Sequence, residues 1–360
     1  MTDQYTPLLS DEERAARRAQ RARVRKQKQR ARRRRQLKQL LPVFALILVG
    51  GIALSVWGNR SEPAEPEIEP ALPPVQTVVV PPELPPEPEE THYSVEKTPS
   101  TISLGEEIDS SYAILIDLQT DSVIAEKASD TIISPASMTK LMTLLVAVEH
   151  ITDLEATTSV TIDITDYCFI NECSVMGLEI GEVVTLRELL YGTILPSGAD
   201  ASLALAVYLA GSHEAFVEMM NEKAAELGLS ETTHFTNCVG LNDDTHKCTV
   251  YDMAMILKAA MDNELCREVL KSRTYETSPT TEHPDGQILS NWFLRRIEDH
   301  DTGDIEVIGA KTGYVMESGS CAASCGEDPD GNRYICVTGD ASSHWKAIDD
   351  HDMLYRTYCN

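Results

Sequence analysis

The sequence predicts an α+β fold in which strands from the two ends of one domain meet in an antiparallel sheet. Two short strand-like runs come first and three more come near the end, with turn residues between them. These runs lie at 111–118, 122–127, 305–312, 318–325 and 333–338. A helical block separates the two groups, a pattern typical of a sheet with segregated helices. We therefore expect an antiparallel sheet with flanking terminal helices on one face and a helical subdomain on the other.

Apolar periodicity predicts the helices. The first begins near Ser137, after Pro135, where a serine can satisfy unpaired backbone N–H groups. Its stripe at i, i+3, i+4 and i+7 consists of Leu141, Leu144, Leu145 and Val148. Further helices are expected at 185–195, at 199–209, from Ser212, from Thr249, which forms a capping-box pattern with Asp252, and at 344–358.

The N-terminal segments predict a membrane anchor. Residues 1–39 form a basic tail with 14 Lys and Arg against 4 Asp and Glu, although the whole chain has a net charge of −26. Residues 40–57 contain no charged side chain and are long enough to span a bilayer as a helix. The basic flank then places the N-terminus in the cytoplasm and the remainder outside. A cleaved signal peptide, with Ala53 and Ser55 as a weak cleavage site, is the alternative. Positive charge beside a span ordinarily sets topology, so nucleic-acid binding by the tail is disfavoured.

Residues 58–104 are predicted to be an extracellular stalk that holds the domain away from the membrane. The segment Ser61–Glu90 contains ten prolines and many glutamates, so it cannot bury a core and should stay extended. The remaining residues, 105–360, are enough for one large domain.

One serine and two lysines provide the first candidate catalytic groups. Ser137 and Lys140 lie three residues apart on one helix face, so Lys140 can reach the Ser137 hydroxyl. A serine becomes nucleophilic when a neutral base takes its proton, and burial or a second cation lowers the pKa of a lysine toward that state. The expected second cation is Lys311, in Lys311-Thr312-Gly313 on a predicted strand. The Ser-x-x-Lys spacing alone is weak, because Ser94 and Ser343 begin the same pattern.

A third element makes the set specific. Ser197 lies between the two motifs, in the run from Leu195 to Asp200. With these three motifs in this order, residues 105–358 resemble the low-molecular-weight penicillin-binding proteins, specifically the serine-type D-Ala-D-Ala carboxypeptidases. The run Thr236–Leu241, followed by His246, adds to the resemblance. It implies the DD-peptidase/β-lactamase fold, with the site between the sheet and the helices.

The resemblance implies a substrate and a reaction. The substrate would be a peptidoglycan pentapeptide ending in D-Ala-D-Ala, cleaved in cell-wall maturation, and β-lactam antibiotics would be covalent inhibitors. Ser137 would form an acyl-enzyme after Lys140 takes its proton, and Ser197 would relay a proton to the leaving D-alanine. No metal and no organic cofactor is required.

The third motif is implied to bind the substrate. Lys311 and Thr312 would hold the terminal carboxylate, and Gly313 would let the substrate approach the strand closely. The backbone N–H groups of Ser137 and Tyr314 would form the oxyanion hole.

The second motif departs from the family at one position. The family pattern Ser-x-Asn reads Ser197-Gly198-Ala199 here, and alanine makes no side-chain hydrogen bond. Asp200 or water is a candidate replacement, although the simpler expectation is that Asp200 turns the chain into the next helix. The alternative functions are a β-lactamase and a penicillin-binding sensor or scaffold with little turnover. A class A β-lactamase needs a deacylating glutamate, and no Glu-x-x-Leu-Asn element follows Ser197.

The cysteines indicate an oxidising compartment. All nine lie beyond residue 160, outside the predicted span, which favours structural disulfides. The nearest pairs along the chain are Cys168 with Cys173 and Cys238 with Cys248. A hairpin pair among Cys321, Cys325 and Cys336, and a long-range pair of Cys266 with Cys359, are further alternatives. The odd count leaves at least one thiol free or paired between chains.

Overall fold

The computed structural model describes residues 93–359, whose strands form one six-stranded sheet and two small two-stranded sheets. The strands are β1 (Glu96–Ser103), β2 (Tyr112–Asp117), β3 (Ser122–Lys127), β4 (Thr157–Ser159), β5 (Val183–Thr185), β6 (Thr274–Glu276), β7 (Ile288–Ser290), β8 (Glu306–Val315), β9 (Gly319–Glu327) and β10 (Arg333–Ala341). The order in the large sheet is β1-β3-β2-β10-β9-β8, so the strand that carries Lys311 lies at an edge.

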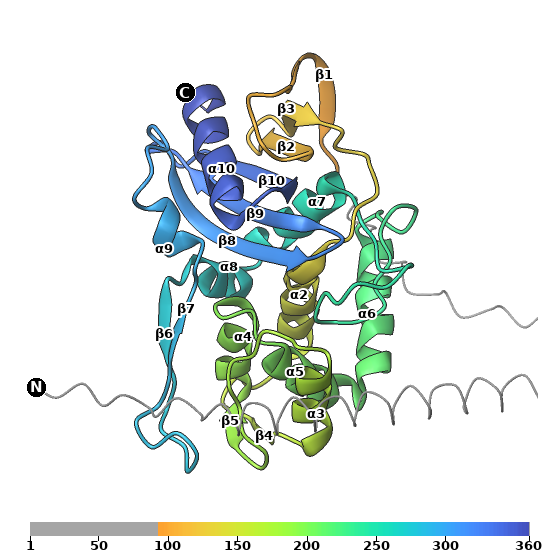
Figure 1. Cartoon of the computed structure of the whole chain (residues 1–360), viewed down its shortest axis with the longest axis vertical. Coiled ribbons are helices and arrows are strands. Elements are labelled where there is room, and N and C mark those ends of the chain that lie inside the picture. The colour runs from red at the N-terminus through yellow and green to blue at the C-terminus, as the bar shows by residue number, and fades with distance from the viewer. Residues whose placement is uncertain (1–92, 360) are drawn as a thin grey trace, which may run out of the picture. The chain divides into compact units, whose positions relative to one another are not determined.

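Helices fill the middle of the chain and end it. They are η2 (Ala136–Thr139), α2 (Lys140–His150), α3 (Ile162–Ile170), α4 (Leu186–Ile194), α5 (Ala199–Ala210), α6 (His213–Glu226), α7 (Val250–Asp262), α8 (Glu264–Lys271), α9 (Leu294–Ile297) and α10 (His344–Tyr358). Figure 1 shows α10 on one side of the sheet, with α2 and α7 toward the other.

Two hydrophobic clusters account for this layering. The larger joins the helical block to one sheet face through residues such as Ile114 and Ala323, and the smaller joins α9 and α10 to the other face through residues such as Leu115 and Ala322. Neighbouring residues of one strand belong to different clusters, because successive side chains of a strand point to opposite faces. The α+β architecture predicted from the sequence is therefore confirmed.

The sheet differs from the prediction at its other edge. The expectation was a fully antiparallel sheet that begins after a stalk ending at residue 104. Instead β1 pairs in parallel with β3, from Glu96 opposite Ser122 to Ser103 opposite Glu126. The sheet is thus mixed, and the predicted end of the stalk is wrong, because the last residues assigned to it form a strand of the domain.

Helix starts test the capping predictions. The Thr249 side chain accepts from the Asp252 N–H, and the Asp252 carboxylate accepts from the Thr249 N–H, which confirms the capping box. The capping role expected of Ser137 is wrong, because η2 begins without any side-chain cap. The Ser137 hydroxyl is therefore left for other contacts.

The predicted tail, span and most of the stalk lie outside the described residues. Within 93–359, none of the helices combines the length and the apolar character that a bilayer crossing needs.

The predicted hairpin pairing of Cys336 with Cys321 or Cys325 and the long-range pairing of Cys266 with Cys359 are not present in the structure. Cys321 and Cys325 belong to the cluster on one face of the sheet, whereas Cys336 belongs to the cluster on the other. The same separation by the sheet keeps Cys266 from Cys359. All nine cysteines are unpaired thiols in the structure.

Candidate active site

The serine and lysine of the first motif meet at the junction of η2 and α2. Lys140 is the first residue of α2 and is 1 % exposed, while Ser137 is half-buried. Lys140 Nζ lies 3.1 Å from Ser137 Oγ. The tight turn of η2, with the Met138 N–H donating to the Pro135 carbonyl, brings the two side chains to one face. The predicted pairing of nucleophile and base is therefore present geometrically.

A second contact of Lys140 was not anticipated from the sequence. Its ammonium nitrogen donates to the Val239 carbonyl at 2.6 Å, and the same carbonyl lies 3.5 Å from Ser137 Oγ. Asn237 shapes this loop, because its side-chain oxygen accepts from the N–H groups of Val239, Gly240 and Leu241. The run Thr236–Leu241 was noticed only as part of the resemblance, and nothing local in it reveals a contact with Lys140.

Gly240 is required by the same loop. Its φ is +84°, and a Cβ there would lie 1.9 Å from the Ala136 carbonyl oxygen and 2.8 Å from Ser137 N. Only glycine permits both this backbone conformation and this approach. The loop therefore holds η2 in place from one side.

The buried side chain of His246 stabilises η2 through a hydrogen bond to Thr139. His246 Nδ1 accepts from the Thr236 N–H at 3.0 Å, so its other nitrogen, Nε2, carries the hydrogen that Thr139 Oγ1 accepts at 2.8 Å. Thr139 in turn donates to the Ala136 carbonyl at 2.7 Å. Burial lowers the pKa of His246 to about 4, so this histidine is a neutral structural link at physiological pH.

The second serine pairs with the second lysine. Lys311 Nζ donates to Ser197 Oγ at 2.9 Å and to the Thr312 carbonyl at 2.7 Å, and the Lys311 side chain is 2 % exposed. Ser197 has φ +60°, a left-handed conformation that costs energy for a residue with a Cβ. Such strain in a half-buried serine is typical of functional positions.

Gly313 brings the strand against the first motif. A Cβ on Gly313 would lie 3.0 Å from Ser137 N, from the Pro135 oxygen and from the Ala136 Cβ. The sequence predicted that Gly313 makes room for substrate, whereas the structure shows that it makes room for η2. The Tyr314 ring points out, is exposed and contacts His344 edge-on at 5.4 Å between centroids.

Burial dominates the electrostatics of the two lysines. It lowers the pKa of Lys140 to about 8. Burial, and then repulsion from Lys140, hold the pKa of Lys311 well below its usual value. The predicted repulsion between the two lysines is present, and it lowers the pKa of Lys311.

Asp200 has a structural role at the start of α5. This confirms the prediction that it turns the chain into that helix. It is 2 % exposed, and its carboxylate accepts from the backbone N–H groups of Met176, Gly177 and Leu178. These hydrogen bonds link the 173–178 segment to the start of α5, so the carboxylate already has its partners. Ala199, which stands where the family has asparagine, donates its N–H to the Ser174 carbonyl at 2.8 Å.

The substitution Ala199→Asn is expected to destabilise the protein by about 1–3 kcal/mol, because the larger asparagine side chain would overpack a buried position. Ala199 is 1 % exposed, and next to it a Cβ on Gly198 would lie 2.7 Å from the Gly192 carbonyl. Thermal denaturation measures the cost, and Val207→Asn at an exposed position of the same helix is the matched control. A gain in D-alanine release from a D-Ala-D-Ala peptide by Ala199→Asn would contradict this packing argument.

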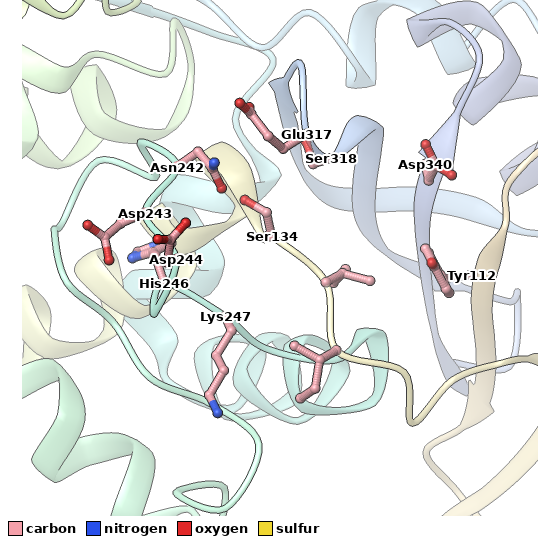
Figure 2. A pocket seen from close by; sticks show the side chains of 12 residues that line it. Tyr112, Ser134, Asn242, Asp243, Asp244, His246, Lys247, Glu317, Ser318 and Asp340 are labelled. Atoms are coloured by element: carbon pink, nitrogen blue, oxygen red, sulfur yellow. The ribbon is translucent and has the colours of Figure 1, made fainter.

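A pocket of about 330 Å³ is lined by Ser134, by residues 242–244 and 246–247, and by Glu317, Ser318 and Asp340, among others. Figure 2 shows Ser134 between the segment that carries Asn242, Asp244 and Lys247 on one side and Asp340 on the other. The acidic lining residues are Asp243, Asp244, Glu317 and Asp340. In the described part of the chain, no group of three or more His, Cys, Asp or Glu is placed to hold a metal ion.

The structure thus brings the sequence-predicted residues into two serine–lysine pairs, and the strand that carries Lys311 packs against η2 at Gly313. Ser137 pairs with Lys140, and Ser197 pairs with Lys311, with Thr312 and Gly313 on the adjoining strand. Two hydroxyls held by two buried amines can exchange protons with a group bound between them, without any other acid or base.

Comparisons with known proteins agree with this geometry. A family model described as peptidase S11, D-alanyl-D-alanine carboxypeptidase, matches residues 96–343. The D-alanyl-D-alanine carboxypeptidase DacF of Bacillus subtilis is 35% identical over 232 residues, covering 64% of this chain and 57% of that protein. DacA of Escherichia coli is 33% identical over 220 residues, covering 59% of this chain and 52% of that protein. The chain therefore spans little more than half the length of these relatives.

Solved structures agree as well. The crystal structure of a Streptomyces DD-transpeptidase has a TM-score of 0.62 and 28% identity, covering 69% of this chain and 97% of that one. A D-alanyl-D-alanine carboxypeptidase from Mycobacterium tuberculosis has a TM-score of 0.61 and 25% identity, covering 71% of this chain and 92% of that one.

Proposed function

Because the chain belongs to the peptidase S11 family of D-alanyl-D-alanine carboxypeptidases, we propose that it hydrolyses the terminal D-Ala-D-Ala bond of peptidoglycan stem peptides in cell-wall maturation. The observation that carries the proposal is the pair of buried lysines, each within hydrogen-bonding distance of a serine hydroxyl.

The first half-reaction forms an ester. Neutral Lys140 takes the proton of the Ser137 hydroxyl while Ser137 Oγ attacks the carbonyl carbon of the penultimate D-alanine. The backbone N–H groups of Ser137 and Tyr314 stabilise the oxyanion that develops, each contributing about 3–4 kcal/mol to the transition state. The peptide bond then breaks as the proton taken by Lys140 passes through Ser197 to the leaving D-alanine nitrogen, which leaves Lys140 neutral. Water then attacks the ester while Lys140 accepts a proton from it, and Lys140 returns this proton to Ser137 Oγ as the ester C–O bond breaks.

The second lysine suits a carboxylate. Burial, and then repulsion from Lys140, hold the pKa of Lys311 below its usual value. A bound substrate carboxylate supplies a negative partner, so binding raises the pKa of Lys311 and favours its charged form. Thr312 adds a hydroxyl beside the same carboxylate. Binding of the substrate therefore stabilises the protonated form of Lys311.

The edge position of β8 suits an extended peptide. A substrate can add to a free strand edge through main-chain hydrogen bonds. With its carboxylate at Lys311 and its reacting carbonyl beside Tyr314, the peptide continues toward Ser318 and the acidic pocket. An acidic lining there favours a cationic residue upstream over an anionic one.

Release of D-alanine tests the proposal against its rivals. The purified chain should release D-alanine from a pentapeptide ending in D-Ala-D-Ala and should become labelled by a fluorescent penicillin. A β-lactamase would instead turn over the penicillin rapidly and spare the peptide. A sensor or scaffold would be labelled but would release no D-alanine, which would overturn the carboxypeptidase proposal.

We further infer that the chain is a single-pass membrane protein with its N-terminus in the cytoplasm and its catalytic domain outside. The uncharged run at 40–57 after the basic tail supports this topology. Such a location would expose the cysteines to an oxidising compartment, in which disulfides persist.

A truncated chain that begins at Thr91 is expected to be soluble without detergent and as active on the pentapeptide as the full chain, because the Pro- and Glu-rich composition of the segment before it cannot bury a core. Partition of the two chains between membrane and soluble fractions measures the anchor. A full chain that stays soluble would refute the span.

A further inference from the structure

Three segments that meet around the backbone nitrogen of Ser137 continue into the walls of the acidic pocket. One wall begins at Ser134, three residues before the nucleophile. The second follows Gly240, where a Cβ would lie 2.8 Å from Ser137 N. The third follows Gly313, where a Cβ would lie 3.0 Å from the same nitrogen. The pocket therefore adjoins the nucleophile, at the end of β8 that turns into β9.

The order of groups along β8 tells which part of a bound peptide passes the pocket. Lys311, the proposed partner of the terminal carboxylate, comes first, Tyr314, the proposed oxyanion donor, comes next, and the pocket residues 317–318 come last. The Ser318 hydroxyl accepts from the Val315 N–H at 3.1 Å, which holds this turn in place. Residues upstream of the scissile bond therefore pass the pocket, whereas the leaving D-alanine does not.

The length of a side chain decides which upstream residue can use the pocket. Because consecutive Cα atoms are 3.80 Å apart, the Cα atoms of Ser134 and Ser137 lie at most about 11 Å apart. In a bound peptide, the residue before the two D-alanines has its Cα about 3.8 Å from the next one, and a lysine amine lies five single bonds of about 1.5 Å farther out. A lysine at that position can therefore reach the pocket wall, whereas an alanine cannot.

The charge of the lining selects the kind of side chain. Four carboxylates and a single ammonium group line the pocket, those of Asp243, Asp244, Glu317, Asp340 and Lys247. The side chains of Asp244, Glu317 and Asp340 are exposed. An excess of carboxylates around a pocket attracts a cation and disfavours an anion.

Asp340 is a positioned carboxylate. Its Oδ2 accepts from the Ser111 hydroxyl at 2.8 Å, and a Cβ on Gly319 would lie 2.7 Å from its Oδ1. Its φ is +59°, a left-handed conformation that costs energy for a residue with a Cβ. A carboxylate has about four acceptor sites, so the contact with Ser111 leaves room for a further donor.

Ser134 contributes a buried hydroxyl that no protein group satisfies. Within the described part of the chain, Ser134 Oγ has no hydrogen-bond partner. Figure 2 shows the hydroxyl directed toward the side on which Asn242 and Glu317 lie. Leaving such a group unpaired costs free energy, which a donor bound in the pocket would recover.

We propose that this pocket binds the side-chain ammonium group of the residue before the two D-alanines of the substrate. The carboxylates of Asp340 and Glu317 are its ion-pair partners, and the Ser134 hydroxyl accepts a hydrogen bond from it. The inference rests on the proposed carboxypeptidase function and adds to it a preference for stem peptides that carry a diamino acid at this position.

The experiment compares three pentapeptides that end in D-Ala-D-Ala and differ only at the residue before them, which is lysine, norleucine or glutamate. Norleucine keeps the carbon chain of lysine without its amine. For the full chain in detergent, kcat/KM for D-alanine release should be about tenfold higher with lysine than with norleucine, and lowest with glutamate. The difference should appear mainly in KM, because the ammonium group binds away from the reacting atoms.

Variants of the lining assign the preference to the pocket. Asp340→Asn removes the charge but keeps an acceptor for Ser111, and it should lower the ratio of the lysine to the norleucine kcat/KM about threefold, as should Glu317→Gln. Ser134→Ala should lower the same ratio by a smaller factor. Glu327→Gln, at the end of β9 opposite Gly319, is the matched control and should leave the ratio unchanged.

Equal kcat/KM for the lysine and norleucine peptides would overturn the ammonium site while D-alanine release still supports the proposed function. A ratio that survives Asp340→Asn combined with Glu317→Gln would overturn it as well. If none of the three peptides released D-alanine, the proposed function would fail instead. Competition of the same peptides against labelling by a fluorescent penicillin would then decide the ammonium site, since a tenfold weaker competition by norleucine supports it and equal competition overturns it.

Discussion

Replacement of Ser137 by alanine is expected to abolish covalent labelling by a fluorescent penicillin and to lower D-alanine release by about 10⁴-fold or more. Ser137 is the hydroxyl whose own backbone N–H lies against Gly313, where the oxyanion would form. Its base, Lys140, keeps a pKa of about 8, so a useful fraction is neutral near physiological pH. The Ser197 hydroxyl also accepts a hydrogen bond from a lysine, and its backbone has a strained left-handed conformation. We assign it the relay of a proton to the leaving group.

Three variants serve as controls for this prediction. Ser197→Ala should slow labelling without abolishing it, which separates the relay from the nucleophile. Ser94→Ala and Ser343→Ala alter the other two Ser-x-x-Lys patterns and should leave labelling intact. Ser343 caps α10 by accepting from the Lys346 N–H at 3.2 Å, so its spacing from a lysine reflects a helix start. Labelling that survives Ser137→Ala would transfer the nucleophile to another residue.

The parts of the fold that follow from local patterns were predictable from the sequence. The helices α4, α5, α7 and α10 and the strands β2, β3 and β8 to β10 begin and end close to the predicted residues, because periodicity and capping residues specify them locally. The strand β1 was missed because most of its residues are exposed and polar, without the alternation of a half-buried strand. The three-residue strands of the two small sheets, such as β4 and β6, are too short for any period to show.

The missed parts of the site depend on contacts between distant segments. Lys140 meets the Val239 carbonyl across 99 residues, and Thr139 meets His246 across 107. A sequence motif records which side chains are present but not which backbone carbonyl a lysine will reach. The pairing of Lys311 with Ser197 was not predicted, since 114 residues separate them along the chain.

The cysteine predictions show where spacing misleads. Cys325 lies opposite Ile335 and Cys336 lies opposite Ser324 in the register of β9 and β10. An offset of one residue places the two sulfurs on opposite faces of the sheet, because side chains alternate along a strand. Proximity in a hairpin sequence was therefore insufficient, whereas Cys168 and Cys173 meet because a turn at the end of a helix brings them together.

Replacement of Lys140 by methionine is expected to lower the acylation rate by about 10²–10⁴-fold, the usual contribution of a positioned general base. Methionine fills the buried space without a titratable group. Lys140→Arg should be equally inactive, because a guanidinium stays protonated and cannot take the proton of Ser137. Circular dichroism and the melting temperature should show that both variants are folded, and Lys127→Arg at a half-buried lysine on β3 is the matched control.

The pH dependence of the labelling rate of the unaltered chain also tests whether Lys140 is the base. Burial lowers the pKa of Lys140, so the neutral amine needed for acylation accumulates as the pH rises through about 8. The labelling rate should therefore increase with pH, with its midpoint near 8, and then level off, whereas a lysine with an ordinary pKa would keep the rate rising beyond pH 10. The rate is measured with a β-lactam in single turnover, so that ester hydrolysis does not contribute. A flat profile between pH 6 and pH 10, or a Lys140→Arg variant that still acylates, would show that the proton of Ser137 goes elsewhere.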